Sequence, residues 1–171
     1  MKNLYLKIIE KFKDEEIRKR FTDKQLSFVK HVDLYKGQDY NTNTEAHLFP
    51  ALYVKWSIDY SQNPPSANYN VRLAWEQLRD TSSLNSNDKS LDFINFVNLV
   101  DQILKEIETQ HTSKFTLLSE ELNAEDTIVD TYSLNYRFSY TGKTKTAVVQ
   151  FQKGQIENLQ EKGYIFEQLN D

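Results

Sequence analysis

The sequence predicts an α+β fold, a two-layer sandwich in which two helices cover one face of a mostly antiparallel sheet of about five strands. In the stretch Phe49–Tyr60, apolar side chains alternate with a mixed set at a period of two. Such alternation is typical of a strand in a sheet that is covered on one side. In the stretch Lys89–Thr109, apolar residues recur at helical spacing and form one broad stripe. The strand face and the helix stripe can bury each other, which gives two layers.

A helix is predicted at the start of the chain, over Lys2–Lys13. Its apolar residues recur three and four positions apart, and they are Leu4, Tyr5, Ile8, Ile9 and Phe12. We expect Asp14–Arg20 to be a charged continuation of this helix or a break in it. Three acidic residues precede the basic run Arg18–Arg20 and neutralise it, which favours a solvated helix end over a basic binding site.

Three strands are expected next. The first covers Ser27–Tyr35, and Gly37 ends it, because glycine enters a turn at little steric cost. Its inward side chains are expected to be Phe28, Val32 and Leu34. A polar loop, Gln38–His47, leads to the strand Phe49–Tyr60, which has Pro50 near its start, where a missing backbone donor does least harm.

The strand Phe49–Tyr60 is expected to form a hairpin with a third strand, Tyr69–Arg79, across a proline-containing loop. The core-facing side chains of the second strand would be Leu52, Val54, Trp56, Ile58 and Tyr60, and those of the third Tyr69, Val71, Leu73 and Trp75. The other face of the second strand carries Ala51, Tyr53, Lys55, Ser57 and Asp59. We expect both tryptophans to pack in the core rather than to form a ligand platform.

The long helix and two closing strands complete the predicted domain. The helical stripe comprises Phe93, Phe96, Val97, Val100, Ile103, Leu104 and Ile107, and Ser90 or Asp88 is expected to cap its start. Strands are predicted over Lys114–Leu122 and Ile128–Tyr140. We place the domain at residues 1–142, followed by a C-terminal extension, residues 143–171, with a short strand and a weak helix.

Composition limits the classes of protein. With 171 residues, 39% hydrophobic and 27% charged, the chain suits one folded domain. The absence of cysteine excludes disulfides, thiolate metal sites and a cysteine nucleophile. A net charge of −4 argues against free binding to nucleic acid, which needs a basic surface. We expect neither a secretory signal nor a membrane span, because no run approaches about 18 apolar residues.

No motif in the sequence predicts an enzyme. The three histidines, His31, His47 and His111, lack metal-ligand spacing to one another. The string Gly142–Thr144 resembles only the end of a phosphate-binding loop, without its upstream glycine. The acidic pairs Glu120-Glu121 and Glu125-Asp126 lie in polar stretches and are interpreted as solvated charge. We therefore expect no catalytic residue, no metal site and no cofactor.

Two short strings carry a resemblance to a known family. His31–Gln38 reads HVDLYKGQ, and after a polar gap Phe49–Val54 reads FPALYV. This pattern resembles tail-completion proteins of tailed bacteriophages, the tail terminator or head-tail joining family. In that family a short helix leads into a strand resembling "DLWxGQ", and a strand beginning with Phe-Pro follows. The further order of elements is similar over about residues 1–142.

The resemblance implies a structural virion protein, a tail terminator. Such proteins are similar in having a two-layer subunit that forms a ring, usually a hexamer. The ring caps the tail tube and joins it to the neck, stopper or head connector, and DNA passes through its lumen without specific binding. A mildly acidic ring suits that passage, because a basic lining would hold phosphates. The expected location is the virion tail or neck, after assembly in the host cytoplasm, with no membrane partner.

Three segments are expected to contact neighbouring subunits or the tube. Two are the loops 38–47 and 62–68, and the third is the apolar C-terminal extension, which could add a strand or helix to an adjacent chain or fold back on its own subunit. The residues singled out are Gln38, Asp39, Tyr40, Asn63, Pro64, Pro65, Phe151, Tyr164, Ile165 and Phe166.

Other classes of function remain open from the sequence. Within the virion, the chain could be another neck ring, a stopper or a head-completion protein. Outside it, the chain could be a small cytoplasmic binding module of the immunity or inhibitor type. A hydrolase would need carboxylates that converge in a pocket.

Overall fold

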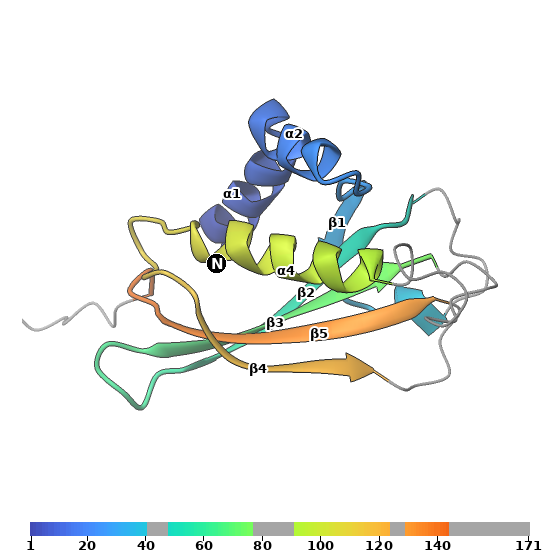
Figure 1. Ribbon diagram of the computed structural model, residues 1–171. Helices are drawn as coiled ribbons and strands as arrows, with labels where there is room; N and C mark the ends of the chain where they lie inside the picture. The colour runs from blue at the N-terminus through green and yellow to red at the C-terminus, as the bar shows by residue number, and fades with distance from the viewer. Residues whose placement is uncertain (41–47, 77–90, 124–128, 144–171) are drawn as a thin grey trace, which may run out of the picture.

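The computed structural model describes residues 1–40, 48–76, 91–123 and 129–143, and in them the predicted α+β class is confirmed (Figure 1). Five strands form one sheet in the order β1-β2-β3-β5-β4. The helices α1, α2 and α4 all lie on one face of this sheet (Figure 1). The predicted C-terminal strand and helix, in residues 144–171, lie outside the described residues.

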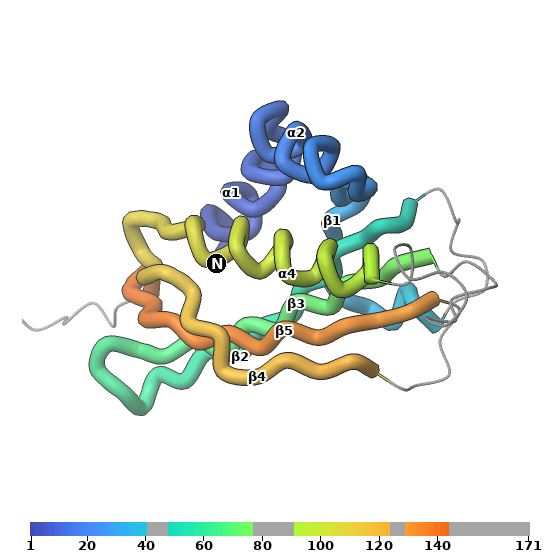
Figure 2. The backbone as a smooth tube through the Cα atoms, viewed as in Figure 1, coloured from blue at the N-terminus to red at the C-terminus, as the bar shows by residue number. Residues whose placement is uncertain are grey.

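The sheet is antiparallel except at one edge. Its strands are β1 (His31–Leu34), β2 (Ala51–Asp59), β3 (Ser66–Trp75), β4 (Thr116–Asn123) and β5 (Asp130–Ser139). β1 runs parallel to β2, whereas the pairs β2–β3, β3–β5 and β5–β4 are antiparallel. The two edge strands, β1 and β4, therefore run in opposite directions. The predicted β2–β3 hairpin is confirmed, and it projects from the sheet beside the end where the N-terminus lies (Figure 2).

The first helix, α1 (Lys2–Lys13), has the predicted bounds. The charged segment after it is neither a continuation nor a simple break, because Glu15–Asp23 forms a second helix, α2. The Asp14 side chain accepts a hydrogen bond from the Glu16 backbone N–H at 2.8 Å, and this cap starts the new helix. Ile17 and Phe21 of α2 are buried, so apolar residues within the charged segment decide its position.

The long helix, α4 (Asp92–Lys105), covers the centre of the sheet and is shorter at both ends than predicted. All seven residues of its predicted apolar stripe are buried, and Leu99 is buried with them. Phe96 packs on Trp75 with ring centroids 4.9 Å apart, and Trp56 stacks on Tyr69 at 5.8 Å. The core-packing interpretation of both tryptophans is thus confirmed. Leu91 precedes the helix without a side-chain cap, and the expected caps at 88 and 90 lie outside the described residues.

Several predictions for the strands were wrong in detail. Tyr60, expected to face the core, follows β2 and is 40% exposed, and β3 spans Ser66–Trp75 rather than Tyr69–Arg79. β1 begins at His31, so Phe28 lies outside the strand and is 37% exposed. Val32 and Leu34 share the helix side of the sheet as expected, although Leu34 at the strand end is also 37% exposed. The buried residues between α2 and β1 are Leu26 and Val29, because the chain after α2 reaches the sheet in an irregular conformation, without strand periodicity. In addition, the second face of β2 is not uncovered along its whole length, since Ala51 and Tyr53 are fully buried.

One carboxylate connects the three helices of this layer. Glu106, which follows α4, accepts from Lys11 of α1 at 2.9 Å and from Arg20 of α2 at 2.7 Å. Burial acts to raise the pKa of Glu106, but the hydrogen bonds from Lys11 and Arg20 outweigh it and hold the pKa below the ordinary 4.5. The side chain is 42% exposed, so solvent screens these ion pairs.

We predict that Glu106→Gln lowers the free energy of unfolding at pH 7 by on the order of 1 kcal/mol. Because the folded-state pKa is depressed, this stability is present above the unfolded pKa, near 4.5, and is lost as the pH falls through the folded value. Urea unfolding of both proteins between pH 3 and 7 measures the difference. Glu10→Gln, at a 70% exposed side chain, is the matched control and should change little at any pH. A difference that persists unchanged at pH 3 would contradict the ion-pair explanation.

Candidate functional site

The face of the sheet that points away from the helices, called here the open face, is polar and balanced in charge. The strand registers place on it Lys55, Ser57, Asp59, Ser66, Asn68, Asn70, Thr116, Ser119, Glu121, Asn123, Ser133, Asn135, Arg137 and Ser139. Its exposed charged members are the cations Lys55 and Arg137 and the carboxylates Asp59 and Glu121, whose formal charges cancel. The half-buried Asp33 of β1 adds one negative charge at the covered end, where Arg72 is neutralised by Asp39. The open face therefore offers amides and hydroxyls with little net field.

Cross-strand hydrogen bonds join many of these side chains. Asn70 donates to the side-chain oxygen of Asn135 at 2.8 Å, and Asn135 donates to the Ser119 hydroxyl at 3.1 Å. Asn123 donates to the Ser133 hydroxyl at 3.1 Å. Such pairs fix side chains across β3, β5 and β4 and use part of their hydrogen-bonding capacity within the sheet. The result is an ordered polar surface, suited to broad contact or to water rather than to enclosing a small molecule.

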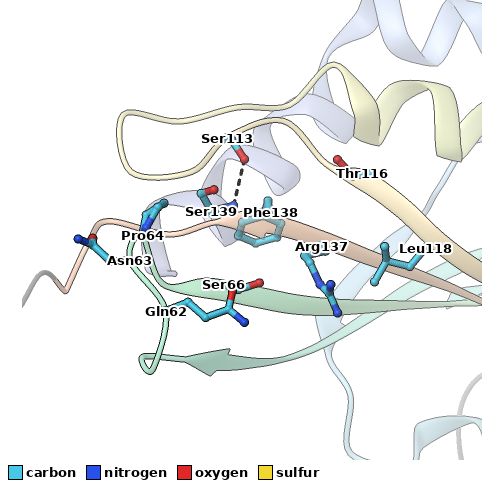
Figure 3. A pocket seen from close by; sticks show the side chains of 10 residues that line it. All are labelled: Gln62, Asn63, Pro64, Ser66, Ser113, Thr116, Leu118, Arg137, Phe138 and Ser139. Carbon is cyan, nitrogen blue, oxygen red and sulfur yellow. Dashed lines mark hydrogen bonds between the residues drawn. The ribbon is translucent and has the colours of Figure 1, made fainter.

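A polar hollow of about 390 Å³ lies where the hairpin tip meets the start of β4 and the end of β5 (Figure 3). Ten residues line it: Gln62, Asn63, Pro64, Ser66, Ser113, Thr116, Leu118, Arg137, Phe138 and Ser139. The Ser139 backbone N–H donates to the Ser113 hydroxyl at 3.0 Å and holds the two walls together. Arg137 is the one charged residue in this lining. The hollow can therefore bind a polar group, but its lining contains no pair of groups for acid–base catalysis.

The expected contact residues Asn63, Pro64 and Pro65 lie at the tip of the hairpin. Asn63 and Pro64 are exposed, and Pro65 is half-buried because its carbonyl accepts from the Tyr140 backbone N–H at 2.8 Å. The tip is thus attached to the end of β5 while its outermost residues remain accessible. This arrangement leaves Asn63 and Pro64 exposed at the tip, where a partner protein could contact them.

The other end of the sheet is covered by a short 3-10 helix, η1 (Gln38–Tyr40), which carries a fully buried carboxylate. Asp39 accepts a hydrogen bond from Nε of Arg72, a β3 residue that is itself 7% exposed. The Arg72 guanidinium lies 5.5 Å from the centre of the Tyr35 ring and 5.8 Å from that of Tyr40. A second small core lies at this end of the open face and comprises Phe49, Ala51, Tyr53, Ala74 and Val129. Because η1 and this small core cover one end of the sheet, Ala51 and Tyr53 are buried there.

The string HVDLYKGQ, on which the family resemblance depends, forms a turn that bonds to itself. Gln38 donates to the Leu34 carbonyl at 2.7 Å and accepts from the Lys36 backbone N–H at 2.7 Å. Gly37 has φ +83°, a conformation that favours glycine. The turn places the next residue, Asp39, within hydrogen-bonding distance of Arg72. The residue types of this string are therefore explained by the turn that they form, a structural role that the sequence analysis did not identify.

The structure separates the first group of expected contact residues. Asp39 has no exposed surface and Gln38 is bonded within its own turn, whereas Tyr40 is 47% exposed. The sequence did contain a signal that a carboxylate such as Asp39 is buried. Arg72 is a lone cation among the apolar residues of β3, and a cation within a buried strand requires a partner. Phe151, Tyr164, Ile165 and Phe166 lie outside the described residues.

The strongest pKa shifts belong to tyrosines. Burial raises the pKa of Tyr35 and of Tyr53 to about 12, so both hydroxyls stay protonated and can act as donors near neutral pH. Within the described ranges, no three His, Cys, Asp or Glu residues gather where they could hold a metal ion. None of the helices there combines the length and apolar character needed to cross a membrane.

Comparison with known proteins adds no relative to these observations. No protein-family model matches the chain, and no curated protein matches it significantly. The function has to be argued from the fold and from the surfaces described above.

We predict that Asp39→Asn lowers the free energy of unfolding by about 3–5 kcal/mol, because it removes the charge that compensates the buried Arg72. The double variant Asp39→Asn with Arg72→Met should lose less stability than the sum of the two single losses. In the double variant neither charge of the pair remains, so no unpaired charge is buried. Guanidinium unfolding followed by tryptophan fluorescence measures all three.

Asp59→Asn, at an exposed carboxylate on the same sheet, is the control and should shift stability by less than about 0.5 kcal/mol. If Asp39→Asn unfolds at the same denaturant concentration as this control, the ion pair does not anchor η1.

Proposed function

We propose that this chain is a structural subunit that assembles with copies of itself into a ring, and that the ring is the tail terminator of a tailed bacteriophage. In this proposal the ring caps the tail tube and connects it to the neck or head connector. The chain has no catalytic role. The open face of each subunit lines the lumen through which DNA passes.

The observation that carries the proposal is the open face itself. A basic wall would bind phosphates by releasing their counterions, and a strongly acidic wall would repel them. The open face avoids both, because its exposed formal charges cancel, Asp33 adds a single half-buried negative charge, and most of its other exposed groups are amides and hydroxyls, with Leu118 as an apolar exception. A surface of this kind suits a wall past which DNA must move without being held.

The arrangement of elements also supports the proposal. A helix, a short strand, a long hairpin, a second long helix and two closing strands follow one another in the order that the family resemblance implies. The helix α2 is an addition to that order. Within the described residues, α1, α2 and α4 lie on one face, so the part of the opposite face outside the second small core is left for a role other than core packing (Figure 1).

The polar hollow at the hairpin tip favours a second candidate, a small binding module of the immunity type. There, the exposed Asn63 and Pro64 would contact a target protein, and the subunit would act alone. A different neck ring, a stopper or head-completion protein, would use the same self-assembly as a terminator. Oligomeric state separates the binding module from both rings.

We predict that the purified protein forms closed rings with about six times the 20.2 kDa mass of the chain. Mass photometry gives the stoichiometry, and negative-stain electron microscopy shows the lumen, which should admit duplex DNA and so measure about 20 Å or more. Adding the rings to polymerised tail-tube protein from the same genome should place them at tube ends. A monomer at micromolar concentration would contradict the proposed ring. Rings that form but do not bind to tube ends would favour the stopper.

A second prediction tests which face lines the lumen. Ser57→Lys with Thr116→Lys adds two cations per subunit to the exposed open face, whereas Asn98→Lys with Gln102→Lys adds two to the outer side of α4. Preformed rings of the first variant should retain linear duplex DNA at low salt but not closed-circular DNA, which cannot thread a closed ring. The second variant should not distinguish the two DNA forms. Equal retention of linear and circular DNA by the first variant would place the open face outside the lumen.

A further inference from the structure

The strand β4 is an edge strand whose exposure calls for a partner. In the described part of the sheet it has a neighbour, β5, on one side only. Leu118 and Leu122 are 50% and 59% exposed, and most other β4 residues are exposed as well. Proteins usually shorten, twist or cover such edges, because a long edge with apolar side chains pairs readily with another chain.

The helical layer leaves the β4 edge uncovered on its own side. Helix α4 packs over β5, where Phe93 meets Tyr132 with ring centroids 6.2 Å apart and Asp101 accepts from the Tyr136 hydroxyl at 2.9 Å. Leu122 is paired with Tyr132 in the register, so it lies on the helix side of the sheet, and its 59% exposure means that α4 does not cover it. Glu120 lies on the same side, two residues away.

The opposite edge of the sheet carries complementary groups. Leu34, at the end of β1, lies on the helix side, because it is paired with the core residue Val54, and it is 37% exposed. Exposed lysines flank β1 at Lys30 and Lys36, whereas β4 carries exposed carboxylates at Glu120 and Glu121. The exposed charges on β4 are therefore acidic and those that flank β1 are basic, with the half-buried Asp33 within β1, and each edge presents a leucine on the helix side.

Strand direction fits a head-to-tail contact between these edges. Because β1 and β4 run in opposite directions, copies related by rotation about a ring axis bring β4 of one beside β1 of the next in antiparallel order. Pairing β4 with a second β4 would instead place glutamates near glutamates, which is unfavourable.

We propose that β4 of each subunit pairs antiparallel with β1 of the next, with Leu122 beside Leu34 and Glu120 beside Lys36, so that the sheets of the ring join into one closed barrel. This inference rests on the proposed ring and names the surface that closes it. Closure covers both edges. At β1 the new strand has to replace two local bonds, because the Leu34 N–H donates to the Asp33 side chain at 2.7 Å and the Leu34 carbonyl accepts from Gln38 at 2.7 Å. The Tyr5 hydroxyl already donates to the Val32 carbonyl at 3.4 Å, and the second lone pair of that oxygen can still accept from a neighbouring strand.

The dimensions of such a barrel agree with the proposed function. With strands about 4.8 Å apart and tilted by about 40°, six five-stranded sheets give a circumference of roughly 190 Å and a diameter of about 60 Å. Side chains of the open face would narrow this opening by about 10–20 Å in total. The remaining lumen is wider than duplex DNA.

Disulfide trapping tests the contact directly, because the chain contains no cysteine. Within one subunit β2, β3 and β5 separate β1 from β4, so positions 34 and 122 are about 19 Å apart, well beyond the roughly 7 Å that a disulfide spans. After mild oxidation, the double variant Leu34→Cys with Leu122→Cys should give a ladder of cross-linked species up to the full ring on a denaturing, non-reducing gel. Each single variant should remain monomeric on that gel.

The outcomes separate this inference from the proposed function. Rings in mass photometry without a ladder would overturn the edge contact and leave the terminator proposal standing. Complete dimers of Leu122→Cys alone would show that β4 pairs with β4, and would overturn the inference. Absence of both rings and ladder would overturn both proposals. Occupation of either edge by residues 144–171 would also prevent the ladder and so count against the contact.

A charge exchange provides an independent test without cysteine. Glu120→Lys should raise the protein concentration needed for half-assembly by about tenfold, because it places like charges opposite each other. Adding Lys36→Glu should restore assembly. Glu10→Lys, at an exposed position on α1, is the matched control and should assemble like the unaltered chain. Failure of Lys36→Glu to rescue Glu120→Lys would contradict the proposed register.

Discussion

The packing of α4 on the β3–β5 pair is the constraint on which the rest of the structure depends. Its apolar stripe meets the core faces of both strands, and Phe96 lies at the centre of the contact, against Trp75 and Phe21. Burial of one side of the sheet fixes the register of every strand, because a shift by one residue would turn each core side chain outwards. The polar residues of β3, β5 and β4 are therefore forced onto the opposite face. The open face is a consequence of the core, and so is its continuity across strands.

A second core limits how far the open face extends. Near η1, the pair formed by Asp39 and Arg72 carries charge into the interior, where each ion needs the other. Tyr35 and Tyr53 surround the pair and close this end with aromatic surface. The open face thus has a covered end and an uncovered end, and the hairpin tip with its polar hollow lies at the uncovered one. Such asymmetry suits a subunit whose two ends meet different neighbours, as the terminator proposal requires.

The proposals about function concern surfaces rather than a reaction centre. Charge balance on the open face, the exposed leucines of β4 and the opposite charges of the two edges are separate observations. Together they describe a subunit that contacts copies of itself through its edges and presents an unreactive wall between them. Tyr136, whose pKa is raised by burial, agrees with this description, because its protonated hydroxyl donates to Asp101 in the packing of α4 on β5.

The sequence by itself determined the fold class, because the periods of two and of 3.6 in β2, β5 and α4 are local properties that a reader can count. It also identified many residues of the main core and the packing of both tryptophans against it, though not Ile17 or Phe21. Tertiary structure alone decided the rest. Helix α2 forms within a charged segment because Ile17 and Phe21 are buried in the core. Asp39 attaches η1 to the sheet because it accepts a hydrogen bond from Arg72 of β3. Those outcomes depend on residues distant in the chain, and local periodicity carries no information about such partners.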